Sequence, residues 1–170
     1  MSLRIVEPRG EAEMAAFRAL NWDYRAFLLS LPAPDDAAVL AAYPEEKYRA
    51  VLDAAGTANR PPRGMMRLVL DGDRPVGCGT IQTFAPGDAE IKRVFIAPAA
   101  RGKGAGRRLV EQLVADCREL SFRRILMDTG RGLTAAQALY DAMGFVRRGP
   151  YHDAPEDIAR LLVFYEMALD

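Results

Sequence analysis

Arg101-Gly102-Lys103-Gly104-Ala105-Gly106 is the stretch that decides how this chain folds. It follows an apolar run over residues 91–96 that is typical of a strand, and it precedes residues with helical spacing. The first turn of a helix leaves about four backbone N–H groups unpaired and carries roughly half a positive charge. Glycines lack the Cβ atoms that would keep an anion from the main chain, and flanking basic residues add positive charge. The stretch therefore predicts a cradle for a phosphate or a pyrophosphate.

The glycine spacing excludes two common nucleotide motifs. The dinucleotide fingerprint G-x-G-x-x-G requires a glycine three positions after Gly104, where this chain has Arg107. The Gly102-Lys103 pair does not complete the P-loop pattern G-x-x-x-x-G-K-[ST]. The remaining pattern is R-x-x-G-x-G, and a basic, glycine-rich surface turn is the alternative interpretation of these six residues.

Length and composition favour one domain over residues 1–170. Apolar residues make up 50% of the 170 positions, which is enough to bury a core at this length. The 23 Lys and Arg residues balance the 23 Asp and Glu residues. This zero net charge predicts no nucleic-acid partner and no membrane partner.

Cysteine usage and hydropathy predict a cytoplasmic protein. Cys78 and Cys117 lack the C-x-x-C spacing, which fits reduced thiols better than a disulfide scaffold. No apolar run approaches the roughly 20 residues of a membrane span. Glu7, Pro8 and Arg9 interrupt the N-terminal apolar segment that a signal peptide needs.

The N-terminal part of the chain predicts mostly helix. Apolar residues at helical spacing follow a short apolar strand, and Pro61-Pro62 marks an irregular segment. The expected elements are a strand over residues 3–6, helices over residues 11–29 and 36–55, a turn over residues 31–35 and a loop over residues 56–64.

The middle of the chain predicts three strands. An Asp-Gly turn between two apolar runs is a strong hairpin signal, and a second turn leads into the third strand. In that third strand the alternation of apolar residues slips between Ile91 and Val94, which indicates one extra residue, a β-bulge. We expect the strands over residues 65–70, 75–84 and 89–97, and the bulge near residues 92–94.

The C-terminal part predicts a helix, a parallel strand, a second helix and two closing strands. The first helix should lay one apolar stripe on the sheet and leave Asp116 in water. Residues 134–137 have capping-box form, and Gly144 supplies a left-handed C-terminal cap. Strand, helix and strand imply a parallel crossover. The strands are expected over residues 124–128, 145–148 and 160–169, and the fold class is α/β (α+β).

Two motifs in the right order resemble one family. The pattern R-x-x-G-x-G after Glu90-Ile91-Lys92-Arg93-Val94-Phe95-Ile96 resembles the acetyl-CoA signature of the GCN5-related N-acetyltransferase (GNAT) superfamily. Downstream, Ala138-Leu139-Tyr140-Asp141-Ala142-Met143-Gly144-Phe145 looks like the family's A-x-x-L-Y-x-x-x-G-F segment. The order of the expected elements resembles the same family over nearly the whole chain.

The resemblance implies a GNAT acyltransferase fold, with a mixed sheet of six to seven strands, about four helices, and splayed fourth and fifth strands. It implies acetyl-CoA as the acyl donor, whose pantetheine arm pairs with main-chain groups of Val94 and Ile96, and an oxyanion near the backbone N–H of Val94. No metal is implied, and the single histidine excludes metal sites that need two or more. The implied cofactor-binding residues are Val94, Phe95, Ile96, Arg101, Gly102, Lys103, Gly104, Ala105, Gly106 and Arg107.

The resemblance also implies direct attack of an amine on the thioester, which requires a base and an acid. An amine with a pKa near 10.4 is less than about one part in a thousand deprotonated at pH 7. Glu90 is the candidate base, acting through water, and its alternative is a solvated strand residue paired with Lys92 or Arg93. Tyr140 is the candidate acid that protonates the departing thiolate, and its alternative is packing in a half-buried helix.

Several positions leave alternatives open. Many members of the superfamily carry Asn seven residues before this Tyr, and here the position is Leu133. His152 is either a surface loop residue or an acceptor contact. Trp22, Tyr24 and Phe27 line an acceptor pocket or belong to the core.

The sequence therefore predicts an acyl-CoA-dependent N-acetyltransferase acting on a small-molecule or peptide amine. A non-catalytic acyl-CoA-binding module is the alternative, and Leu133 favours it. The acceptor and the acyl-chain preference stay open. A homodimer also stays open, since an apolar strand over residues 161–165 can pair across two chains as well as within one.

Overall fold

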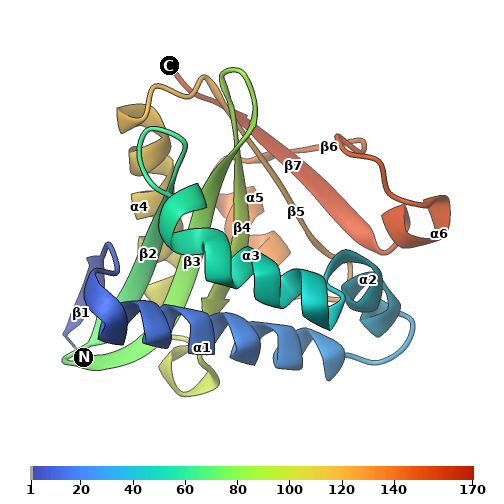
Figure 1. Ribbon diagram of the computed structural model, residues 1–170. Helices are drawn as coiled ribbons and strands as arrows, with labels where there is room; N and C mark the ends of the chain where they lie inside the picture. Colours follow the sequence, from blue (N-terminus) through green and yellow to red (C-terminus); the bar gives the residue numbers. More distant parts are fainter. Residues whose placement is uncertain (1) are drawn as a thin grey trace.

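The computed structural model describes residues 2–170 as one seven-stranded sheet with helices on both faces (Figure 1). The strand order is β1-β2-β3-β4-β5-β7-β6. The strands are β1 (Leu3–Val6), β2 (Gly64–Asp71), β3 (Arg74–Ala85), β4 (Asp88–Ile96), β5 (Arg124–Gly130), β6 (Val146–Arg148) and β7 (Leu162–Ala168). The helices are α1 (Gly10–Leu29), α2 (Asp35–Ala42), α3 (Glu45–Ala58), α4 (Ala105–Glu119), α5 (Thr134–Ala142) and α6 (Glu156–Ala159), with one 3-10 turn (Pro98–Ala100).

Two apolar clusters hold the layers together. Alternate residues of a strand point to opposite faces, so β2 contributes Met66 and Leu68 to one cluster and Val69 to the other. Helix α1 packs on the first face with Phe17, and α4 packs on the second with Leu113. In Figure 1, α1 and α3 lie on the opposite side of the sheet from α4 and α5.

Strand β4 contains the predicted bulge. Cys78 pairs with Phe95 and Thr80 pairs with Lys92, so two steps along β3 oppose three along β4. Arg93 takes up the extra residue with a left-handed φ of 54°. Beyond the bulge the strand turns Phe95 toward α1, and it turns its neighbours Val94 and Ile96 toward the α4 cluster.

Strands β4 and β5 pair in parallel over a short distance and then separate. The last paired residues are Glu90 and Leu126, although β4 continues to Ile96 and β5 to Gly130. Beyond this point β5 pairs with β7 on its other edge. The predicted splay of the fourth and fifth strands is therefore confirmed, and it leaves one edge of β4 free.

The expectation of a single helix over residues 36–55 is wrong. The structure has α2 and α3 instead, separated at Tyr43 and Pro44. Proline cannot donate the backbone hydrogen bond of a helix interior, and it disfavours helical geometry in the residue before it. Pro44 therefore starts a new helix, which runs on through residues 56–58 of the expected loop. This split and the short α6 bring the number of helices to six.

Two further expectations about helices are corrected. Asp116 of α4 is buried rather than wet, because its carboxylate accepts two hydrogen bonds from the Arg67 guanidinium, at 2.6 and 2.7 Å. The capping box of α5 does not form. Leu133 is the N-cap, and the Gln137 amide donates to the carbonyls of Gly130 and Arg131 instead. The left-handed cap at Gly144, with φ 89°, is confirmed.

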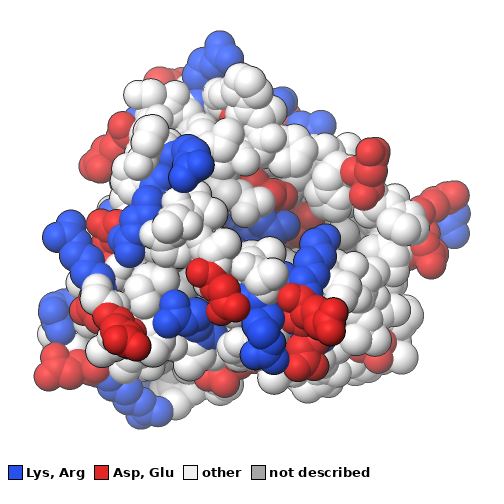
Figure 2. Space-filling model, in the orientation of Figure 1, with Lys and Arg blue, Asp and Glu red and all other residues white. Residues whose placement is uncertain are grey.

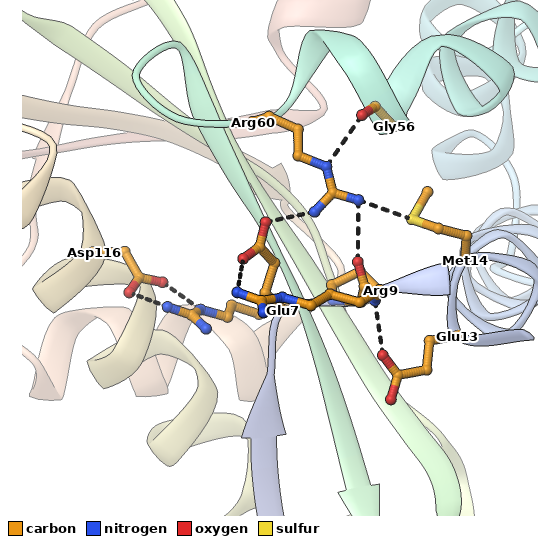
Figure 3. Close-up of polar contacts among 9 residues, drawn as sticks. Glu7, Arg9, Glu13, Met14, Gly56, Arg60 and Asp116 are labelled. Carbon is orange, nitrogen blue, oxygen red and sulfur yellow. Dashed lines mark hydrogen bonds and ion pairs between the residues drawn. The ribbon is translucent and has the colours of Figure 1, made fainter. Parts of the chain in front are cut away.

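A polar cluster fastens the start of α1 to the end of α3. Arg60 donates to the Glu7 carboxylate, to the Pro8 carbonyl and to the Gly56 carbonyl (Figure 3). The Glu13 carboxylate accepts from the backbone N–H of Arg9 at the N-terminus of α1. These contacts hold α1 and α3 together on one face of the sheet.

Charge and strand pairing at the surface bear on partners. Lys, Arg, Asp and Glu are interspersed over the face that carries α1 and α3 (Figure 2). Strand β7 pairs with β5 along one edge, and β6 covers the other edge only at Phe164, Tyr165 and Glu166. Within residues 2–170, no helix is long and apolar enough to cross a bilayer.

Candidate active site

The glycine turn opens α4 as the sequence predicts. Gly102 and Gly104 have φ values of 74° and 77°, a left-handed region that disfavours other residues. Gly104 is the N-cap of α4, and no side chain caps this helix end. A Cβ atom on either glycine would meet nothing within 4 Å, so the space above the helix start is open. Unpaired N–H groups, the helix dipole and open space together suit an anion.

The basic residues of the turn differ in what they do. Arg101 folds back on the protein, with Nε donating to the Ile96 carbonyl at 2.9 Å and the guanidinium 4.6 Å from the ring centre of Phe27. Arg107 forms an ion pair with Glu111 at 3.3 Å. The positive charge expected from the basic residues of the turn is therefore partly used in contacts within the protein.

The glycine-turn cavity, of about 490 Å³, lies between β4, α4 and α5. The free edge of β4 and the start of α4 form its walls. It brings together eight of the ten residues predicted to bind the cofactor, and Lys103 and Arg107 do not line it. Its predicted lining residues are Val94, Phe95, Ile96, Arg101, Gly102, Gly104, Ala105 and Gly106.

Tyr140 lies in the wall of this cavity. It projects from α5, is 6% exposed, and packs edge-on against Phe145 and Tyr165 at 5.9 and 5.6 Å between ring centres. Burial raises its pKa above the ordinary value, so the hydroxyl keeps its proton at physiological pH. Its contacts with Phe145 and Tyr165 also agree with the alternative interpretation, in which Tyr140 is a packing residue.

A second cavity, of about 360 Å³, lies on the α2 side of the split, and we call it the carboxylate cavity. Glu90 and Asp128 contribute carboxylates to it, and helices α2 and α6 contribute apolar side chains. The two cavities share one wall where β4 and β5 have separated. The residues lining both are Tyr24, Leu31, Asp128, Thr129 and Leu133.

Glu90 is not a solvated strand residue. It is 4% exposed, and its Oε1 accepts from Gln82 Nε2 at 2.9 Å. Its Oε2 accepts from the Tyr151 hydroxyl at 2.7 Å and lies 3.7 Å from Lys92 Nζ. The expected partner Arg93 does not pair with it among the described residues. Glu90 thus ends the paired part of β4 as a buried carboxylate with one hydrogen bond at each oxygen.

Lys92 and Lys47 both line this cavity, and Lys92 lies beside Glu90. Burial of Lys92 acts to lower its pKa, but the negative charges of Glu90 and Asp128 and the Tyr43 side chain outweigh burial and raise the pKa above the ordinary value. The ammonium therefore stays charged. It lies 5.9 Å from the ring centre of Tyr43.

His152 lies in the loop after β6 with its side chain partly exposed, and it also lines the carboxylate cavity. Its Nε2 lies 2.6 Å from Oδ2 of Asp128, and the two side chains are 28% and 24% exposed. The hydrogen bond to Asp128 raises the pKa of His152, and the charge of Glu90 adds to this effect. Phe164 of β7 supports the imidazole at 5.3 Å between ring centres.

Sequence reasoning missed Gln82, Asp128 and Tyr151. Asp128 ends the predicted strand over residues 124–128, and a carboxylate after an apolar strand beside the predicted split was the one available signal. Gln82 and Tyr151 carried no signal, because only folding brings them within hydrogen-bond distance of Glu90.

Of the three α1 aromatic residues that the sequence offers for an acceptor pocket, two line a cavity and one does not. Tyr24 lines both cavities, and Phe27 lines the glycine-turn cavity. Trp22 packs edge-on against Tyr48 at 5.1 Å between ring centres, on the α3 side. Within residues 2–170, no group of three or more His, Cys, Asp or Glu side chains is arranged to hold a metal ion.

A mixed sheet whose parallel strands separate beside a glycine-rich helix start defines the acyl-CoA acyltransferase class of fold. The model of the acetyltransferase (GNAT) family matches residues 16–145. The chain therefore belongs to the GNAT family.

Curated relatives support the same family. An IAA acetyltransferase from Azospirillum brasilense is 40% identical over 77 residues, which cover 45% of this chain and 50% of that protein. A mycothiol acetyltransferase from Geodermatophilus obscurus is 32% identical over 121 residues, covering 66% of this chain and 39% of that protein. The matched part thus spans less than two thirds of either relative.

Solved structures share the fold at low sequence identity. A GNAT-family acetyltransferase from Staphylococcus aureus has a TM-score of 0.75 at 14% identity, over 99% of this chain and 100% of that one. A phosphinothricin acetyltransferase from Sinorhizobium meliloti, solved in complex with AcCoA, has a TM-score of 0.71 at 22% identity, over 99% of this chain and 89% of that one.

Proposed function

We propose that the protein is an acyl-CoA-dependent N-acetyltransferase that moves an acetyl group from acetyl-CoA to a primary amine by direct attack in a ternary complex. The split between β4 and β5 carries this proposal. The glycine-turn cavity and the carboxylate cavity share a wall there. A donor and an acceptor that enter from opposite sides can therefore meet at one point.

The residues of the glycine-turn cavity fit acetyl-CoA, which supplies an acyl thioester. The uncapped start of α4, with the left-handed Gly102 and Gly104, suits the pyrophosphate. The free edge of β4 beyond Glu90 offers backbone groups to the pantetheine amides, as another strand would. We assign these contacts to Val94 and Ile96, with the backbone N–H near Val94 stabilising the oxyanion.

Tyr140 is the proposed acid. Its buried hydroxyl remains protonated at neutral pH and borders the cavity that would hold the thioester. A phenol in this position can donate its proton to the departing thiolate.

Glu90 is the proposed catalytic carboxylate on the acceptor side. It is only 4% exposed and each oxygen accepts a hydrogen bond, so we propose that it acts on the amine through an intervening water rather than by direct contact. A buried negative charge beside the split also favours a cationic acceptor. Replacement of Glu90 with Gln should alter the pH–rate profile, and an unaltered profile would remove it from the mechanism.

The remaining assignments concern the protein as a whole. We propose that residues 1–170 act as one acetyltransferase unit with a small-molecule or peptide amine as acceptor, and without a metal. We place it in the cytoplasm, because Cys78 and Cys117 are both free and buried. A homodimer through β7 stays open, because β6 covers only part of that edge.

A thiol-release assay tests the proposal. Purified protein is incubated with acetyl-CoA and a panel of amines, polyamines, amino acids, aminoglycosides and peptides. Release of free thiol that depends on one acceptor class, together with acetylated product by mass spectrometry, is the expected result. Binding of acetyl-CoA without turnover on any acceptor would favour the non-catalytic binding module instead.

A further inference from the structure

The imidazole of His152 is held in one orientation inside the carboxylate cavity. Its Nε2 lies 2.6 Å from Oδ2 of Asp128. A carboxylate accepts and does not donate, so Nε2 carries the hydrogen and Nδ1 carries the lone pair of the neutral ring. Within residues 2–170, nothing donates a hydrogen bond to Nδ1.

The loop that carries His152 is anchored on both sides. Tyr151 donates to Glu90 at 2.7 Å and packs edge-on against Phe84 at 5.2 Å between ring centres. Phe164 contacts both Tyr151 and His152, at 5.6 and 5.3 Å between ring centres. The imidazole is therefore positioned by packing from β3, β4 and β7 as well as by Asp128.

His152 differs from Glu90 in what remains available for an acceptor. Glu90 is 4% exposed and bonded at both oxygens. The His152 side chain is 28% exposed and lines the cavity, with one ring nitrogen free of any described donor. His152 is the more exposed of the two groups and is therefore the better placed to accept a proton in the cavity.

We propose that His152 is the group that takes the proton from the acceptor amine, and that Asp128 is its positioning residue. This inference rests on the proposed acetyltransferase function. Glu90 acts on His152 only through its charge, because its own hydrogen bonds go to Gln82 and Tyr151. The ring nitrogen Nδ1 accepts one proton from the ammonium, which leaves a neutral amine with a free lone pair. The imidazolium that forms is stabilised by Asp128, with the buried charge of Glu90 behind it.

The proton balance is complete with these groups. The amine nitrogen forms a bond to the thioester carbonyl carbon, the carbon–sulfur bond breaks, and the sulfur receives the Tyr140 proton. Tyr140 regains a proton from solvent, and the acylated nitrogen and His152 each release one proton to solvent. The net products are an amide, free CoA thiol and one proton.

Charges from several elements face His152. Asp128 of β5 and Glu90 of β4 favour its protonated form, and Lys92 of β4 opposes it. Asp35 of α2, Lys47 of α3 and the neighbouring Asp153 also line the cavity. The hydrogen bond to Asp128 is the largest of these effects and outweighs burial, so the pKa of His152 lies above its usual value of about 6.5. The adjoining Tyr151 hydroxyl stays protonated, because burial raises its pKa.

The pH dependence of turnover tests the proposal, with whichever amine the wild type accepts. Wild-type kcat/KM should rise with pH and level off above the pKa of His152. The variant H152Q keeps a donor for Asp128 but has no basic nitrogen. We expect its kcat/KM to be about 100-fold lower at pH 7 and to keep rising about tenfold per pH unit, because only amine that is already free then reacts.

Two matched variants and a direct titration complete the experiment. D128N should move the acidic limb of the profile to lower pH, and E156Q, an exposed residue of α6, should change neither rate nor profile. His152 is the only histidine, so NMR of tag-free wild-type protein reports its pKa without any mutation. That titration should coincide with the acidic limb.

The outcomes separate the inference from the function on which it rests. Wild-type turnover with an H152Q profile of unchanged shape would overturn the role of His152 and leave the acetyltransferase intact. A histidine pKa that does not match the acidic limb would do the same, even if H152Q failed to fold. No turnover by the wild type on any amine would count against the proposed function, and the inference would fall with it.

Discussion

The glycine turn and the carboxylate cavity are built in opposite ways. The turn and the strand before it come from one continuous segment, residues 88–106, and they offer mainly backbone groups and a helix end. The carboxylate cavity collects side chains from both ends of the chain, from Tyr24 of α1 to Leu162 of β7. Recognition by the main chain is therefore encoded locally, whereas recognition by side chains depends on the assembled fold.

The largest effect is expected at Tyr140, beside the wall that the two cavities share. Y140F removes the proposed acid and keeps the ring that packs against Phe145 and Tyr165. We expect kcat to fall by about 100-fold or more, with little change in the Kd of acetyl-CoA. Thiol release and calorimetric binding measure the two quantities. Unchanged turnover would show that Tyr140 is a packing residue, and the acid would then have to be sought elsewhere.

A substitution in the glycine turn should instead weaken the binding of acetyl-CoA and leave kcat nearly unchanged. G104V places a β-branched residue at φ 77°, where a side chain costs about 1–2 kcal/mol, so we expect acetyl-CoA to bind about tenfold more weakly. The value of kcat at saturating acetyl-CoA should be nearly unchanged. G149A is the control, because Gly149 has ample space and no left-handed backbone. Equal losses in both variants would mean that the turn has no special part in binding.

A substitution in the carboxylate cavity should affect the reaction of the acceptor without affecting the binding of acetyl-CoA. Y151F removes the hydrogen bond to Glu90 and leaves a buried carboxylate oxygen with Lys92 as its remaining neighbour, a change that costs about 1–3 kcal/mol. The kcat/KM for the acceptor should fall about tenfold, whereas the Kd of acetyl-CoA should stay constant. A parallel loss of acetyl-CoA affinity would show that the two regions are not independent.

The smallest effect is expected at Leu133, where the two regions meet. Leu133 is the N-cap of α5 and offers no hydrogen bond there, and Asn at an N-cap typically contributes about 1 kcal/mol. L133N should therefore raise the Tm by roughly 2 °C, after some loss of apolar contact. Thermal unfolding checks this, and thiol release shows whether the family's Asn also increases turnover. A lower Tm would mean that apolar contact of Leu133 outweighs the missing cap.

Much of the fold follows from local sequence patterns. The hairpin at Asp71-Gly72, the bulge at Arg93 and the cap at Gly144 each depend on residues within a few positions of one another. Two of the wrong expectations about helices have different causes, one local and one non-local. Pro44 divides the expected helix through its own backbone, whereas Asp116 is buried only because Arg67, far away in the sequence, comes to lie beside it.

The geometry of the glycine turn can be predicted from the sequence more fully than the contacts of the carboxylate cavity, for the same reason. Glu90 was singled out from its place on the bulged strand, but its partners Gln82 and Tyr151 are 8 and 61 residues away. His152 was ambiguous because its partner Asp128 is 24 residues away. A loop residue becomes a cavity residue only when another strand supplies the group that holds it.

The sequence alone determined the family, the strand–turn–helix unit and the expected donor, because glycine spacing, hydrophobic period and helix start act over short separations. The tertiary structure decided which carboxylates are buried, which ring nitrogen is free and where the two cavities meet. The physical reason is that a backbone anion site needs only a helix end, whereas the partners and burial of a titratable side chain depend on residues brought together by folding.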